Sequence, residues 1–123
     1  MMNNAKKILV VDDDKAITTL LESLLLGQGY HVTKASDGLE AMVQVKNSAP
    51  DLIVLDIMMA EINGYDVCSH LKFDDNFKHI PIIILTSREQ ELDPKLGRLM
   101  GIGYMRKPID SKALLEKIQA TLN

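Results

Sequence analysis

Carboxylate, hydroxyl and ammonium side chains stand directly after short, strand-like segments at four places in this sequence. An aspartate run, Asp12–Asp14, follows the first apolar run, and Asp56 follows a later one. A hydroxyl pair, Thr86–Ser87, follows a third apolar run, and Lys107 follows the mixed segment Ile102–Arg106. Clustered carboxylates repel one another, and a hard divalent cation such as Mg²⁺, which prefers oxygen ligands, relieves this repulsion. A carboxylate can also attack phosphorus, while a lysine and a hydroxyl bind the phosphoryl oxygens. These residue types therefore fit phosphoryl transfer to an aspartate.

The elements that must bring these residues together are apolar runs alternating with helical patterns. The predicted strands are Lys7–Val11, Tyr30–Lys34, Asp51–Leu55, Pro81–Leu85 and Ile102–Arg106. The predicted helices are Ala16–Leu26, a helix capped by Asp37, Tyr65–Lys72, Glu91–Met100 and a last helix capped by Asp110. This alternation predicts an α/β fold whose parallel sheet carries helices on both faces. Ligands bind such sheets beyond the carboxyl ends of the strands. If the second strand lies at an edge, the other four strand ends converge on one pocket.

The spacing of apolar residues predicts which side of each helix is buried. Cys68 lies on the apolar side of the third helix and is expected in the core. Asp14 is placed to cap the first helix. The expected buried faces are Ile17, Leu20, Leu21, Leu24 and Leu25 in the first helix, and Leu39, Met42 and Val43 in the second.

Length and composition predict a single globular domain spanning residues 1–123. The net charge of −3 disfavours direct nucleic-acid binding, because general nucleic-acid binders are usually basic. The one cysteine cannot form an internal disulfide, which fits a reducing compartment. No signal peptide is visible, and no apolar run is long enough to span a bilayer. We therefore expect a cytoplasmic protein without membrane insertion.

The ordered set of motifs resembles the receiver domains of two-component response regulators. The matching segments, in the family's order and spacing, are Ile8–Asp14, Asp51–Asp56, Asn63–Gly64, Ile80–Ser87 and Tyr104–Pro108. The resemblance covers nearly the whole chain, from about Lys6 to Leu122. It implies one receiver domain with a flavodoxin-like sheet of strand order 2-1-3-4-5 and five helices, as in chemotaxis receivers.

The resemblance also implies how the acidic residues act. Asp56 is the expected phosphoacceptor. Asp12 and Asp13 are the expected acidic pair that holds Mg²⁺, with Asp13 as the more direct ligand. Asp56 and the backbone carbonyl of Met58 complete the expected metal site.

Further residues are implied to bind the phosphoryl group and to transmit the signal. Thr86 and Lys107 are expected to contact the phosphoryl oxygens, and the peptide bond from Lys107 to Pro108 is expected to be cis. Tyr104 is expected to turn inward as Thr86 moves toward the phosphate. The expected output surface comprises the fourth helix, the fifth strand and the fifth helix. The implied partners are a sensor histidine kinase or histidine phosphotransfer protein as donor, and a downstream protein or output domain as target.

Two positions depart from the family pattern. Ala60 stands where a proline is usual, and it should leave the loop after Asp56 more flexible. Arg106 is unusual before Lys107, and strand alternation puts it on the same side as Tyr104. The phosphate lifetime and the choice of partner therefore do not follow from the motifs.

Other functions remain open at this point. The aspartate run contains a D-x-D after an apolar strand, as in haloacid-dehalogenase-like phosphatases with Asp12 as nucleophile, although Ala16 is not the residue expected there. The chain would otherwise be a pseudo-receiver, an interaction domain that is never phosphorylated. A flavin-binding protein is less consistent, because no phosphate-binding loop follows the first strand. The main hypothesis is a signalling switch that catalyses its own aspartyl phosphorylation. Which aspartate carries phosphate, Asp56 or Asp12, separates it from the phosphatase.

Overall fold

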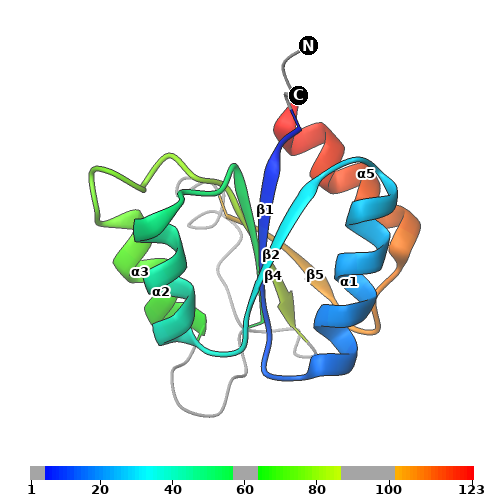
Figure 1. Cartoon of the computed structure of the whole chain (residues 1–123), viewed down its shortest axis with the longest axis horizontal. Coiled ribbons are helices and arrows are strands. Elements are labelled where there is room, and N and C mark those ends of the chain that lie inside the picture. Colours follow the sequence, from blue (N-terminus) through cyan, green and yellow to red (C-terminus); the bar gives the residue numbers. More distant parts are fainter. Residues whose placement is uncertain (1–4, 57–63, 87–101) are drawn as a thin grey trace.

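The structure is a computed structural model that describes residues 5–56, 64–86 and 102–123 (Figure 1). Its strands are β1 (Lys7–Val11), β2 (His31–Ala35), β3 (Leu52–Asp56), β4 (Ile82–Thr86) and β5 (Ile102–Arg106). Its helices are α1 (Lys15–Gly27), α2 (Gly38–Asn47), α3 (Gly64–Lys72) and α5 (Ser111–Leu122). The predicted helix at Glu91–Met100 lies outside the described residues. The predicted bounds of β1 and β5 are confirmed, while β2, β3 and β4 begin and end one residue later than predicted.

The five strands form one parallel sheet in the order β2-β1-β3-β4-β5, which confirms the predicted topology. The second strand lies at an edge, as the convergence argument required. In the register of the central strands, Val11 is opposite Leu55, and Asp56 is opposite Leu85. The carboxyl ends of β1, β3 and β4 are therefore side by side, and the residues after them share one edge of the sheet.

Two apolar cores hold this sheet, one on each face. In Figure 1, α2 and α3 cover one face and α1 and α5 cover the other. All five residues of β3 are buried, because both of its faces are covered. Burial of one aliphatic side chain stabilises the fold by about 1.5–3 kcal/mol. The buried residues of β3 therefore hold the backbone of Asp56 in a fixed position at the end of the strand. The α2–α3 core includes Leu9, Val11, Ile53, Leu55, Ala41, Val45, Val67 and Leu71, and the α1–α5 core includes Ile8, Val10, Leu52, Val54, Leu21, Leu25, Leu114 and Ile118.

The predicted buried faces of α1 and α2 are partly wrong. Leu20 is 47% exposed, whereas Leu39 and Val43 are 64% and 56% exposed. The small residues Gly38 and Ala41 face the core instead, together with Val45. This stripe has helical spacing, and its short side chains let α2 approach β1 and β2 closely. Burial therefore follows the closest approach of the helix to the sheet rather than the largest apolar side chains.

Aspartates begin three of the four helices in the described part of the chain. Asp14 Oδ1 accepts a hydrogen bond from the Ala16 amide at 2.9 Å, and Asp37 Oδ1 accepts one from the Glu40 amide at 2.8 Å. Asp110 Oδ1 caps α5 in the same way, accepting from the amide of Ala113 at 3.1 Å. The three predicted caps are confirmed.

Within the described ranges, no helix combines the length and apolarity needed to cross a bilayer.

Cys68 is buried on α3, as predicted, and it forms no disulfide. Burial raises the pKa of its thiol to about 12, against the opposing charge of Lys72. The thiol of the unfolded chain ionises near 9.0, whereas the folded protein keeps this proton until about pH 12. This contribution to stability is therefore complete below about pH 9 and is lost as the pH rises toward 12.

We expect the free energy of unfolding to fall more steeply above about pH 9 in the parent than in Cys68→Ala, by at most about 1.4 kcal/mol per pH unit. Urea unfolding under reducing conditions at a series of pH values measures this difference. Lys72, whose pKa is lowered by burial, is present in both proteins, so its opposite effect largely cancels. Parallel pH profiles for the two proteins would contradict the burial argument.

Candidate functional site

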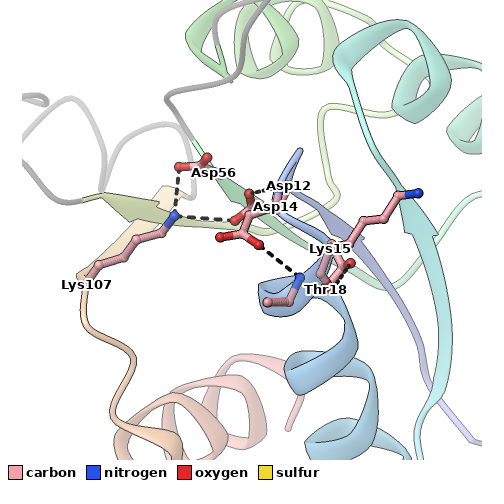
Figure 2. Close-up of polar contacts among 7 residues, drawn as sticks. Asp12, Asp14, Lys15, Thr18, Asp56 and Lys107 are labelled. Atoms are coloured by element: carbon pink, nitrogen blue, oxygen red, sulfur yellow. Dashed lines mark hydrogen bonds and ion pairs between the residues drawn. The ribbon is translucent and has the colours of Figure 1, made fainter.

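Residues from three strand ends meet at the carboxyl edge of the sheet (Figure 2). Asp12 follows β1, Asp56 ends β3, and Lys107 follows β5. The Nζ atom of Lys107 lies 3.4 Å from Asp12 Oδ2 and 3.4 Å from Asp56 Oδ1. One ammonium group thus bridges two carboxylates from different strands.

A third carboxylate completes an acidic cluster. One oxygen each from Asp12, Asp13 and Asp56 lies within 4.8 Å of the others. Asp12 and Asp56 are 2% and 4% exposed, whereas Asp13 is exposed to solvent. Carboxylate oxygens this close suit a hard divalent cation that retains some of its water. The donor set therefore fits Mg²⁺, and the exposure of Asp13 leaves the cluster accessible.

The backbone around Asp12 fixes the direction of its carboxylate. The Asp12 amide donates to the carbonyl of Ala35 at 3.1 Å, which ties the residue to the end of β2. Asp12 Oδ1 accepts a hydrogen bond from the Asp14 amide at 2.9 Å. Its other oxygen, Oδ2, faces Lys107. Both oxygens of this buried carboxylate thus have defined partners.

Burial raises the pKa of the Asp12 carboxyl, and the neighbouring charge of Asp56 raises it further. The hydrogen bond from the Asp14 amide and the ammonium of Lys107 oppose this rise. Negative charge at the cluster is therefore only partly compensated by the protein. A bound cation would therefore be stabilised at this cluster.

A cavity of about 380 Å³ adjoins Asp12 on the side of β2. Lys15 and Thr18 from α1, and Lys34 and Ser36 at the end of β2, contribute to its lining. This cavity was not predicted from the sequence. The polar residues at the end of the second strand could have indicated it. They were not used because the pocket was expected at the ends of the other four strands.

The structure brings together Asp12, Asp13, Asp56 and Lys107, as the strand-end argument predicted. The bond from Lys107 to Pro108 is cis, as expected. The backbones of Thr86 and Tyr104 belong to the neighbouring strands β4 and β5, but their side chains lie outside the described part of the structure. Also outside the described residues are Met58, Ala60, Asn63 and Ser87.

Comparison with known proteins links this geometry to one family. The family model for the response regulator receiver domain matches residues 8–119. The chain is 42% identical over 118 residues to the alkaline phosphatase synthesis transcriptional regulatory protein PhoP of Bacillus subtilis, covering 95% of this chain and 48% of PhoP. It is 36% identical over 115 residues to protein PilG of Pseudomonas aeruginosa, covering 93% of this chain and 85% of PilG. The chain therefore spans about half the length of PhoP and most of PilG.

Solved structures agree with the sequence matches. The chemotaxis response regulator CheY4 of Vibrio cholerae superposes with a TM-score of 0.86 at 28% identity, covering 97% of this chain and 100% of CheY4. A putative response regulator from Chloroflexus aurantiacus gives a TM-score of 0.86 at 30% identity, covering 97% and 98% of the two chains. Both superpositions thus cover nearly the whole length of this chain.

Proposed function

Because this chain belongs to the response regulator receiver domain family, we propose that Asp56 accepts a phosphoryl group from a phosphohistidine and thereby switches the domain between two states. The observation that carries this proposal is the surroundings of Asp56. Its carboxylate ends a fully buried strand, lies 3.4 Å from the ammonium of Lys107, and belongs to the same acidic cluster as Asp12 and Asp13.

In the proposed reaction, a carboxylate oxygen of Asp56 forms a bond to phosphorus as the bond from phosphorus to the histidine nitrogen of the donor breaks. The histidine leaves with that electron pair, and an aspartyl phosphate remains. The ammonium group of Lys107 compensates the charge on the phosphoryl oxygens. Firm attachment of Asp56 to the central strand supports in-line attack, because phosphoryl transfer depends mainly on positioning and charge compensation.

Mg²⁺ belongs to this proposal as the resident cation. Asp12, Asp13 and Asp56 would hold it, together with the backbone carbonyl of Met58 that the family resemblance implies. When bound, it would offset the negative charge of the carboxylates and of the phosphoryl group. The three carboxylate oxygens within 4.8 Å of one another are the support for this assignment.

Signal output is proposed from the family resemblance. Thr86 would contact the phosphoryl group, and Tyr104 would turn inward with it, altering the surface of the fourth helix, β5 and α5. The pairing of β4 with β5 supports such coupling, since Ile84 lies opposite Tyr104 in the ladder. Arg106, exposed at the end of β5, would add a positive charge near this surface.

Partners and location follow from the same proposal. The donor is a sensor histidine kinase or a histidine phosphotransfer protein, and the target is a downstream protein or an output domain. PhoP is named a transcriptional regulatory protein, and MtrA of Mycobacterium tuberculosis a DNA-binding response regulator. For residues 1–123, which we propose form a single receiver domain, we expect a protein target rather than direct nucleic-acid contact, because the net charge is −3. A cytoplasmic location is part of the proposal.

The phosphatase alternative would need Asp12 as nucleophile. Asp12 is 2% exposed, and its two oxygens already contact the Asp14 amide and Lys107. Nucleophilic attack from either oxygen of Asp12 would compete with the contact that this oxygen already makes. The match to the receiver family over residues 8–119, together with the place of Asp56 at the end of the fully buried β3, favours Asp56.

Incubation with a small acyl phosphate, followed by intact-mass measurement, tests the proposal. We expect the mass of one phosphoryl group to be added in the presence of Mg²⁺, and little or none when Mg²⁺ is removed by a chelator. A known active receiver, treated in parallel, controls for the donor. Absence of the added mass while that control is labelled would indicate a pseudo-receiver and contradict the proposal.

A further inference from the structure

Asp14 is hydrogen-bonded both to the acidic cluster and to the first turn of α1. Its amide donates to Asp12 Oδ1 at 2.9 Å, and its own Oδ1 accepts from the Ala16 amide at 2.9 Å. Its carbonyl accepts from the amides of Ile17 and Thr18, both at 3.1 Å. Figure 2 shows Asp14 between Asp12 and the start of α1. The residue therefore connects the position of a site carboxylate with the start of a helix.

The cap determines where the Asp14 amide points. Asp14 has the extended conformation of a helix cap, with φ −89° and ψ 109°, and the bond from its side chain to Ala16 holds the first turn in place. Without an acceptor at this position, the first amides of α1 lose a partner and the turn frays. The Asp14 amide would then no longer be held toward Asp12 Oδ1.

Asp14 is expected to affect the acidic cluster through its hydrogen bonds rather than through its negative charge. Among the described residues, the carboxylates whose oxygens come within 4.8 Å of one another are those of Asp12, Asp13 and Asp56, and Asp14 is not among them. The Asp14 side chain is directed to the helix, where its oxygen is already used as an acceptor. Its contribution thus passes through the backbone and through Asp12.

We propose that Asp14 is a positioning residue: by capping α1, it presets the carboxylate of Asp12 for a divalent cation. This inference rests on the proposed function in one respect, that Asp12 and Asp13 hold Mg²⁺. It adds a residue outside the ligand set, and it assigns that residue a role that depends on a hydrogen-bond acceptor rather than on a negative charge.

The test compares Mg²⁺ binding, measured by titration calorimetry, in the parent, Asp14→Ala and Asp14→Ser. Serine keeps the capping oxygen and removes the charge. We expect the dissociation constant for Mg²⁺ to rise about three- to tenfold in Asp14→Ala, from the usual loss at a helix cap, and to change less than about twofold in Asp14→Ser. Rescue by serine is the result that a role for the charge would not give.

Asp37→Ala is the matched control, because Asp37 caps α2 through the same kind of bond to the Glu40 amide and is not part of the acidic cluster. We expect its melting temperature to fall about as much as that of Asp14→Ala, with Mg²⁺ affinity unchanged. Equal weakening of Mg²⁺ binding in both alanine variants would attribute the effect to stability and overturn the inference. So would unchanged affinity in Asp14→Ala, or a serine variant as weak as alanine. A parent that binds no Mg²⁺ would instead contradict the proposed metal site, and the inference with it.

Discussion

Asp56→Asn is expected to abolish phosphorylation by a small acyl phosphate while the protein stays folded. The amide has the size of the carboxylate but is no nucleophile toward phosphorus. The change also removes one of two buried negative charges that Lys107 bridges, and the charge of Asp56 is one cause of the raised pKa of Asp12. We therefore expect the thermal midpoint to be equal to or above that of the parent. Intact mass and thermal unfolding measure the two effects.

Asp51→Asn is the matched control for this substitution. Asp51 immediately precedes β3, and its Oδ2 accepts from the Lys7 amide at 2.8 Å, at the end of the sheet away from the cluster. We expect this variant to be labelled as fully as the parent. Labelling of Asp56→Asn to the parent's level would remove Asp56 from its assigned role.

Lys107→Met is expected to change phosphorylation and Mg²⁺ binding in opposite directions. Loss of a cation aimed at the phosphoryl group should slow phosphorylation by on the order of 10²-fold or more. The same ammonium lies 3.4 Å from oxygens of Asp12 and Asp56, so it competes with Mg²⁺ for these carboxylates. We expect Mg²⁺ to bind more tightly, about two- to tenfold on an estimate for a partly screened charge pair. Rates of mass increase and titration calorimetry give the two readouts.

Lys78→Met serves as the control, because Lys78 pairs with Asp75 on the exposed surface at 3.1 Å. An exposed pair of this kind contributes little to stability. Neither the rate nor the Mg²⁺ affinity should change. If Lys107→Met weakened Mg²⁺ binding, the ammonium would be supporting the site rather than competing with the metal.

The sheet and the meeting of the site residues were predictable from the sequence because they depend on short, strongly patterned segments. The run Leu52–Leu55 is apolar throughout, which occurs where both faces of a strand are covered. A polar residue straight after such a run must lie at the carboxyl edge. Asp12 and Asp56 met this condition, and Lys107 follows the predicted strand Ile102–Arg106. The structure brings the three residues together.

The orientation of the helices was less predictable, because it depends on contacts between distant segments. Leu39 and Val43 have the spacing of a buried face, yet α2 turns Ala41 and Val45 toward the sheet. Two overlapping stripes were available in this helix, and the distance to β1 and β2 decided between them. The spacing of apolar residues within one helix does not determine how closely that helix approaches the sheet.

The connection through Asp14 was also only half visible in the sequence. An aspartate before a helical pattern indicates a cap, and that prediction is confirmed. The bond from its amide to Asp12 Oδ1 depends on the backbone path between β1 and α1. Residue types alone do not specify that path.

Direct identification of the phosphorylated side chain shows whether Asp56 is the phosphoacceptor. Borohydride reduces an aspartyl phosphate to homoserine, so reduction of the labelled protein followed by peptide mass spectrometry marks the modified position. We expect homoserine at position 56, dependent on Mg²⁺ during labelling, with aspartate retained at positions 12 and 13. Homoserine at position 12 would contradict it and would support the phosphatase alternative.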